Sequence, residues 1–367
     1  KGRWVPPTET LDVGNSGTLI RLLTGLLAAC PFEVCVTGDA SIQKRPLKRV
    51  LEPLSEMGLG FRKEGKGAAL AADITAPVFL KGTKDLKAIS YKMPVASAQV
   101  KSALLFAALF AKGTSEIIEP VKTRDHTERM LSYYGADVSK KQQTWSLKGG
   151  ALLRNPYEEE PIVVPADLSS ASFFIVLAMM QSRGAVTLSN IGLNPTRTGL
   201  LDVLKQMGIG LKTTLSSHPF EPVGTLTCEP SPIKNSAVPS HLVPNIIDEI
   251  PILSVLASKG AGEFVISDAK ELRVKESDRL AGIERLFKAA KLPIVTTEDG
   301  LTIVGPMQAE TFVFDAKDDH RLAMSAIVLA LAHHVPARVT GCASIATSFP
   351  NFFDLLTQTG ARFRLED

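Results

Sequence analysis

The amino-acid sequence predicts a two-domain protein of the α/β (α+β) class, with buried helices inside and short strands in outer sheets. Three observations lead to this prediction: the chain length, a unit of about 75 residues that recurs along the chain, and a linker-like segment near its middle. With 367 residues, of which 45% are apolar and 22% charged, the chain can bury two cores of ordinary size. Two domains therefore fit this length better than one.

The first part of the recurring unit is an amphipathic helix that ends in a small residue. Glycine just past such a helix is the expected left-handed cap, and an extended stretch then follows. The five copies span residues 50–61, 127–138, 200–211, 282–294 and 352–363, with caps at Gly58, Gly135, Gly208, Ala290 and Gly360. This regular spacing indicates that the chain is built from stacked equivalent units.

The second part of the unit is an almost wholly apolar helix with a polar or small-residue start. Its five copies span residues 11–29, 93–113, 164–180, 248–260 and 315–334. A helix that is apolar on all sides must be buried, so its polar start is the part that can reach a ligand. Short β-branched stretches such as 263–267 and 301–305 predict strands between the helices. Five units divide unevenly between two domains, so either one domain holds two units or a sixth unit is missing.

A linker-like segment, residues 155–167, contains three prolines and an acidic run. It predicts one domain over residues 1–163 and a second over residues 164–367. The net charge of +3 is too small to indicate a nucleic-acid partner, and neither a membrane-spanning run nor a signal peptide is evident. The four cysteines are scattered, without a CxxC pair, which is typical of reduced thiols in a cytosolic protein and argues against a zinc site.

The starts of the apolar helices are candidate anion sites, because the first turn of a helix offers free N–H groups and partial positive charge. The small residues 14–18 would let a ligand approach the backbone, although a plain helix cap explains them equally well. Ser97 and Gln99 could bind hydroxyl or phosphate groups, and Ser97 could instead cap its helix. The polar residues 165–170 are interpreted as capping alone.

Cationic side chains stand beside several of these starts. Lys44 and Arg45 lie in a predicted loop, Arg124 precedes a helix, and Arg321 opens an otherwise apolar helix. A buried arginine without a partner is costly, so Arg321 is expected to bind a carboxylate or a ligand. The neighbouring His320 could be a general acid or base, or a hydrogen-bonded structural histidine.

The stretch ELRVKESDRL, residues 271–280, places Lys275 and Arg279 four residues apart. If a helix opens in its second half, the two cations share a face and repel each other. Nearby carboxylates such as Glu276 and Asp278, or a bound anion, would offset that repulsion.

Two carboxylates, Asp248 and Glu249, are expected in the first turn of a buried helix. The helix N-terminus would stabilise one of them, and a base facing a substrate hydroxyl is the functional alternative. The sequence has no Walker-type loop, GxGxxG motif or metal-ligand cluster. We therefore expect phosphate- and carboxylate-rich substrates held by arginines, with proton transfer that needs neither metal nor organic cofactor.

Eight stretches, in order along nearly the whole chain, resemble the 5-enolpyruvylshikimate-3-phosphate synthases, in the form often called class II. They are LDVGNSGTLIR, GDASIQKRPLKRVLEPL, PVASAQVKSA, TRDHTERML, DEIPILSVLA, LRVKESDRL, DDHRLAMSA and IATSFPNF. The resemblance implies a two-domain inside-out α/β barrel, with three βαβαββ units in each domain, buried helices and outer sheets. It also implies that an N-terminal segment completes the second domain and is absent from this chain.

The resemblance implies transfer of the enolpyruvyl group of phosphoenolpyruvate to the 5-hydroxyl of shikimate 3-phosphate, with release of phosphate, in aromatic amino acid biosynthesis. No metal or cofactor takes part. The residues implied to bind shikimate 3-phosphate are Ser97, Ala98, Gln99, Arg124, Asp248 and Lys275. Those implied to bind phosphoenolpyruvate are Gly17, Arg45, Gln99, Arg279 and Arg321. Asp248 would be the base on the 5-hydroxyl, and Glu276, with Lys275 beside it, would handle the proton at the methylene carbon.

Two departures from the family pattern leave alternatives open. The N-terminal Lys-Ser…Arg motif has no counterpart here, and Thr347 stands where one branch has a lysine on phosphoenolpyruvate. The alternatives are the sister transferase that acts on UDP-N-acetylglucosamine, which usually needs a loop cysteine, and a non-catalytic ligand-binding relative. Gly17 is retained where glyphosate-tolerant relatives carry alanine, which predicts inhibition by glyphosate. We expect a cytoplasmic monomer with no nucleic-acid or membrane partner.

Overall fold

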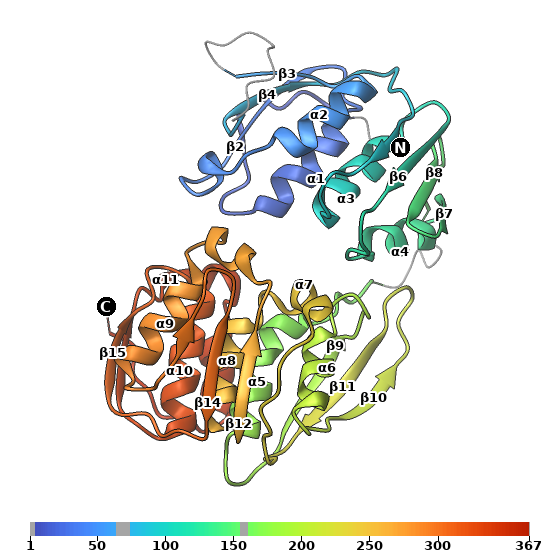
Figure 1. Ribbon diagram of the computed structural model, residues 1–367. Coiled ribbons are helices and arrows are strands. Elements are labelled where there is room, and N and C mark those ends of the chain that lie inside the picture. The colour runs from blue at the N-terminus through green and yellow to red at the C-terminus, as the bar shows by residue number, and fades with distance from the viewer. Residues whose placement is uncertain (1–3, 64–73, 155–160, 367) are drawn as a thin grey trace. The chain divides into compact units, whose positions relative to one another are not determined.

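The computed structural model describes residues 4–63, 74–154 and 161–366 (Figure 1). The chain divides into two compact units, Lys1–Pro161 and Ile162–Asp367. This division lies close to the boundary between residues 163 and 164 that the sequence predicts. The acidic run of the predicted linker, residues 158–160, lies outside the described residues.

The first unit contains the same order of elements twice: strand, helix, strand, helix, strand, strand. The first copy consists of β1 (Leu11–Asp12), α1 (Gly17–Leu27), β2 (Glu33–Thr37), α2 (Lys48–Met57), β3 (Gly60–Arg62) and β4 (Val78–Lys81). The second consists of β5 (Ser90–Lys92), α3 (Ala98–Ala108), β6 (Thr114–Ile118), α4 (His126–Tyr133), β7 (Asp137–Lys141) and β8 (Thr144–Lys148). The sheets have matching orders, β1-β2-β4-β3 and β5-β6-β8-β7, with one parallel pair in each. The βαβαββ unit that the resemblance implies is therefore present twice.

The second unit contains the same order in shortened form. Its first two groups are α5 (Leu168–Met179), β9 (Val186–Gly192), α6 (Gly199–Gln206), β10 (Lys212–Ser216) and β11 (Val223–Cys228), then α7 (Val243–Ile246), α8 (Ile250–Lys259), β12 (Gly262–Ile266), α9 (Arg279–Ala289), β13 (Val295–Thr296) and β14 (Leu301–Gly305). The last group is β15 (Phe312–Asp315), α10 (His320–His333), β16 (Ala337–Thr340), α11 (Ala343–Ser348) and α12 (Phe352–Gln358). The opening strand is reduced to one isolated parallel bridge in the first group, at Ala166, and to two in the second, at Lys234 and Ala237.

The apolar helices form the core of each unit, as their composition predicts. In the second unit α5, α8 and α10 pack against one another, and the strands lie outside them (Figure 1). In the first unit α1 packs along α3, at a distance that only glycine permits. A Cβ on Gly25 would lie 2.1 Å from the carbonyl oxygen of Ala103. This close approach fixes the spacing of the two helices whose starts carry candidate site residues.

Four of the five predicted helix caps are confirmed, since Gly58, Gly135, Gly208 and Gly360 all have positive φ. The fourth copy differs, because Ala290 keeps a φ of −81° and Lys291, one residue later, adopts a φ of 57°. Among the described residues, no helix combines the length and the apolar composition needed to cross a membrane.

Candidate active site

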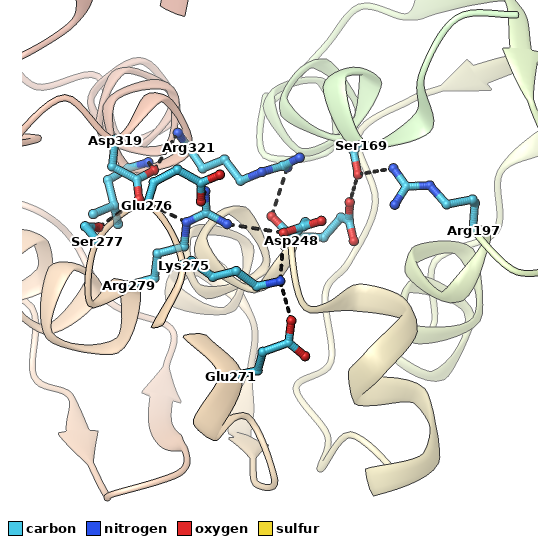
Figure 2. A network of polar contacts seen from close by, with 12 residues as sticks. Ser169, Arg197, Asp248, Glu271, Lys275, Glu276, Ser277, Arg279, Asp319 and Arg321 are labelled. Carbon is cyan, nitrogen blue, oxygen red and sulfur yellow. Dashed lines mark hydrogen bonds and ion pairs between the residues drawn. The ribbon is translucent and has the colours of Figure 1, made fainter. Parts of the chain in front are cut away.

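The second unit gathers its candidate residues where α8, α9 and α10 begin (Figure 2). Asp248 stands just before α8, Arg279 is the first residue of α9, and Arg321 is the second residue of α10. Asp248 and Arg279 come from the second group of this unit and Arg321 from the last, and their polar atoms meet around Asp248. The predicted site residues of this unit are therefore brought together.

Arg279 is almost fully buried, with 1% of its surface exposed. Its Nε donates to Asp319 Oδ2 at 3.0 Å, Nη1 to Asp248 Oδ1 at 3.2 Å and Nη2 to Glu276 Oε2 at 2.7 Å. Burial alone would lower the pKa of Arg279, but the Asp319 and Glu276 carboxylates outweigh it and raise the pKa. The guanidinium is thus a fixed positive charge at the centre of the cluster.

The expectation that Lys275 and Arg279 share a helical face is wrong. Asp278 caps α9 by accepting the Ala281 N–H at 3.0 Å, so the helix begins only at Arg279. Lys275 instead lies directly after the short 3-10 helix η3 (Lys270–Val274), at its C-cap. Its Nζ lies 2.6 Å from Glu271 Oε1 and 3.9 Å from Asp248 Oδ1. Carboxylates therefore offset the repulsion between the two cations, and Asp248 contacts both.

The side chain of Arg321 contacts the backbone of Asp248. Its Nη1 donates to the carbonyl oxygen of Asp248 at 3.0 Å. The helix start beneath it is held by Asp319, which accepts the N–H groups of Arg321 and Leu322 at 3.0 and 3.3 Å and the Ser277 hydroxyl at 2.8 Å. Asp319 is fully buried. Its role was not predictable from the sequence, because its bond to Arg279 spans 40 residues.

Asp248 and Glu249 precede α8, contrary to the expectation that they lie in its first turn. Glu249 is buried, and it accepts a hydrogen bond from the Ser169 hydroxyl. Arg197 donates to Ser169 Oγ at 2.8 Å and to Asp167 Oδ1 at 2.9 Å. Burial raises the pKa of Glu249 above its usual range. Asp167 also caps α5, so capping at residues 165–170 is confirmed. The link from Ser169 to Glu249 was not predicted from the sequence.

The first unit brings together Gly17, Arg45 and Gln99. Gln99 accepts from Arg21 Nη1 at 2.6 Å and donates to the Thr18 hydroxyl at 2.7 Å, which joins the starts of α3 and α1. A Cβ on Gly17 would lie 2.8 Å from Arg45 Nη1. Glycine therefore allows a guanidinium to lie against the first turn of α1.

Arg21 belongs to this cluster although it was not predicted as a site residue. Burial lowers its pKa first, and the neighbouring Arg45 and Arg49 lower it further. Three guanidiniums near one helix start produce the positive field that an anionic ligand needs. The signal in the sequence was Arg21 itself, one helical turn after Gly17.

Ser97 caps α3 by accepting the Val100 N–H at 3.3 Å, and Ser16 caps α1 in the same way at 3.0 Å. The capping interpretation of both starts is confirmed, and it leaves the second lone pairs of the hydroxyls for a ligand. Ala98 is the first residue of α3. Arg124 is exposed in the loop between β6 and α4.

A buried ion cluster connects that loop to α3. Lys101 Nζ lies 2.8 Å from Glu119 Oε1 and 2.5 Å from Glu128 Oε1, and all three side chains are at most 2% exposed. Glu119 also accepts the Thr123 N–H at 3.1 Å and Trp145 Nε1–H at 2.9 Å. Burial raises the pKa of Glu128 despite the attraction of Lys101. This cluster was not predicted from the sequence, although Lys101 inside an apolar helix is a visible sign of it.

The remaining candidates have less defined roles. His320 is the first residue of α10, and burial, followed by the repulsion of Arg321 and Arg279, lowers its pKa to about 4. The ring is therefore neutral near pH 7. Thr347 is exposed on α11. The described residues contain no group of three or more histidine, cysteine, aspartate or glutamate side chains arranged to hold a metal ion.

The chain shares its fold with the enolpyruvyl transferase NikO from Streptomyces tendae. That structure matches 94% of this chain and 76% of its own, with a TM-score of 0.64 at 16% identity. The family model described as EPSP synthase (3-phosphoshikimate 1-carboxyvinyltransferase) matches residues 2–356. The chain belongs to that family.

Individual relatives agree with this assignment. The 3-phosphoshikimate 1-carboxyvinyltransferase of Petrotoga mobilis is 43% identical over 362 residues, which cover 97% of this chain and 81% of the relative. That of Halorhodospira halophila is 42% identical and covers 97% and 78%. The solved EPSP synthase from Acinetobacter baumannii superposes with a TM-score of 0.86 at 37% identity, covering 98% of this chain and 81% of that one. The predicted family and fold class are both confirmed.

Proposed function

We propose that this chain transfers the enolpyruvyl group of phosphoenolpyruvate to the 5-hydroxyl of shikimate 3-phosphate and releases phosphate, a step of aromatic amino acid biosynthesis. Membership of the EPSP synthase family supports this activity. The observation that carries the proposal is the convergence of Lys275, Arg279 and Arg321 on Asp248. One carboxylate among three cations suits proton transfer between anionic substrates.

In the proposed reaction Asp248 takes the proton of the 5-hydroxyl while the hydroxyl oxygen forms a bond to C2 of phosphoenolpyruvate. Glu276, with Lys275 beside it, gives a proton to the methylene carbon, which produces a tetrahedral intermediate. The resulting methyl group then loses a proton, and the bond between C2 and the phosphate oxygen breaks. These two changes release phosphate and restore the double bond. Arg279 and Arg321 would hold the anionic groups of phosphoenolpyruvate throughout.

The candidate residues of the first unit are proposed as further binding groups. Ser97, Ala98, Gln99 and Arg124 would bind shikimate 3-phosphate, together with Asp248 and Lys275. Gly17, Arg45 and Gln99 would bind phosphoenolpyruvate, together with Arg279 and Arg321. The hydrogen bonds of Gln99 to Arg21 and Thr18 support its place among the binding groups of the first unit.

The cysteines weigh against the sister transferase that acts on UDP-N-acetylglucosamine. A cysteine that takes part in proton transfer needs a low pKa and an electropositive, accessible site. Burial instead raises the pKa of Cys30 and raises that of Cys228 to about 12, and burial followed by Asp318 raises that of Cys342. We also propose a cytoplasmic location, since all four thiols are free. Glyphosate inhibition and a monomeric state are further parts of the proposal.

The test is phosphate release from phosphoenolpyruvate by the full-length natural protein, with shikimate 3-phosphate or UDP-N-acetylglucosamine as acceptor. Release with shikimate 3-phosphate alone is expected. Release with the sugar nucleotide would replace the proposed acceptor, and no release with either would leave a non-catalytic relative.

A further inference from the structure

A buried polar network lies beside Asp248. In Figure 2, Ser169 and Arg197 of this network are on the opposite side of Asp248 from Arg279 and Glu276. The network consists of Glu249, which is 3% exposed, Ser169, which is 1% exposed, and Arg197. Ser169 of α5 thus contacts the peptide segment that leads into α8, and Arg197, in the loop between β9 and α6, contacts Ser169. The reaction proposed above gives none of these three residues a role.

The donors of this network are fixed by chemistry. Arginine can only donate, so Ser169 Oγ must accept the bond from Arg197 Nη2 at 2.8 Å. The hydroxyl proton of Ser169 is then free to point at one acceptor, and Glu249 Oε1 is that acceptor. Arg197 is itself held by Asp167 at 2.9 Å. The Ser169 hydroxyl therefore has one orientation, which fixes the Glu249 side chain.

The Glu249 side chain controls how Asp248 is presented, because the two residues share a peptide bond. The carboxylate of Asp248 faces Arg279 and Lys275, and its carbonyl oxygen accepts from Arg321 at 3.0 Å. The N–H of Glu249 is bonded to the carbonyl of Ile246 at 2.8 Å. Anchoring residue 249 at both its backbone and its side chain restricts the rotation that would move either group of Asp248.

Packing alone does not explain the network. A buried carboxylate is costly unless it is paired and hydrogen-bonded, and an apolar side chain at position 249 would fill the space at lower cost. A fully bonded buried network, in contrast, selects one geometry over its alternatives. A site that transfers protons requires geometry of that kind within a fraction of an ångström.

We propose that Ser169 and Glu249 are positioning residues for the reaction, held by Arg197, and that they fix the carboxylate of Asp248 and its carbonyl contact with Arg321. This inference rests on the proposed function, in which Asp248 is the base. The two residues act through Asp248 and do not touch substrate.

The experiment compares Ser169→Ala with Ser254→Ala in the full-length protein. Ser254 is also a fully buried serine, but its hydroxyl bonds within its own helix, to the carbonyl oxygen of Ile250 at 2.8 Å. Both proteins are assayed for phosphate release with shikimate 3-phosphate, and their thermal unfolding is measured. We expect Ser169→Ala to lower kcat about ten- to a hundredfold, the effect of losing one hydrogen bond to a charged group, with KM for shikimate 3-phosphate changed less than about threefold. Ser254→Ala should keep kcat within about threefold at a similar melting temperature.

A second pair of variants, Glu249→Gln and Glu249→Ala, tests whether the hydrogen bond to Ser169 or the charge of Glu249 matters for kcat. Glu249→Gln keeps an oxygen that can accept from Ser169, so kcat should stay within about threefold of the native value. Glu249→Ala should lose as much activity as Ser169→Ala, and the double alanine variant should lose no more than either single one, because both remove the same bond. Additive losses, or a Glu249→Gln loss equal to that of Glu249→Ala, would overturn the positioning role.

Failure of the inference is distinguishable from failure of the proposed function. An active native protein whose Ser169→Ala variant matches Ser254→Ala would overturn the inference alone. A native protein that releases no phosphate would overturn the proposed function, and crystal structures of the variants would then decide the inference without activity. In Ser169→Ala the Asp248 carbonyl should move away from Arg321, while an unchanged contact would refute the positioning role.

Discussion

Replacing Lys101 with methionine should destabilise the first unit more than any exposed charge substitution in it. Lys101 is fully buried, and its partners Glu119 and Glu128 are 2% and 1% exposed at the side chain. Removing the lysine leaves two carboxylates together in the core without their cation. Breaking a buried ion pair from one side costs about 3–5 kcal/mol, and the first unit should lose that much of its free energy of unfolding.

The magnitude depends on pH through Glu128. Its folded pKa is raised above the usual value by burial, so protonation of Glu128 stabilises the fold. That contribution is complete below the unfolded pKa and is lost as the pH rises through the folded pKa. We therefore expect the cost of Lys101→Met to grow from acidic to neutral pH, and Lys101→Met/Glu128→Gln to recover part of it.

The assay is urea unfolding followed by the fluorescence of Trp145, whose indole N–H bonds to Glu119 at 2.9 Å. With a slope of roughly 2 kcal/mol per molar urea, the midpoint should fall by about 2 M. Lys112→Met is the matched control, because Lys112 pairs with Asp85 at 2.6 Å while both side chains are 77% exposed. Water screens such an exposed pair, so its loss should leave the midpoint nearly unchanged. Equal midpoints for the two variants would refute the reasoning.

Two further predictions concern the contact between Gly17 and Arg45 and the protonation of His333. Gly17→Ala places a methyl group 2.8 Å from Arg45 Nη1, so KM for phosphoenolpyruvate and the half-inhibiting glyphosate dose should both rise in the phosphate-release assay. A native dose already as high as that of the variant would contradict this. His333 accepts the Ala309 N–H on Nδ1, which leaves Nε2–H for Ser258, and burial lowers its pKa to about 4. Because the unfolded chain takes up this proton near pH 6.5, the free energy of unfolding should fall by about 2 kcal/mol from pH 7 to pH 5. Urea unfolding at the two pH values should show a smaller fall in His333→Gln, and an equal fall would exclude the histidine as its source.

The repeated architecture was predictable because each copy carries a local signal. An apolar helix and a glycine cap are set by neighbouring residues, and both recur at near-constant spacing. The opening strands of the first two groups in the second unit were not predictable, because the isolated bridges at Ala166, Lys234 and Ala237 leave no alternating pattern.

Site residues were predictable where the family resemblance or a charged side chain at a helix start indicated them. They were not predictable where a hydrogen bond joins residues that are far apart in the sequence. Asp319 bonds to Arg279 across 40 residues, and Ser169 bonds to Glu249 across 80. Nothing local in the sequence indicates either bond. The shared face of Lys275 and Arg279 was predicted wrongly because the capping bond of Asp278 starts the helix later than charge spacing alone suggested.

The central claim is that Asp248 is the base of an enolpyruvyl transfer, and phosphate release by Asp248→Asn tests it most directly. Asp278→Asn is the control, since Asp278 caps the neighbouring helix and asparagine caps equally well. We predict that Asp248→Asn lowers kcat by about 10²- to 10⁴-fold with an unchanged circular dichroism spectrum, while Asp278→Asn stays near the native rate. A kcat within about tenfold of native for Asp248→Asn would contradict the account.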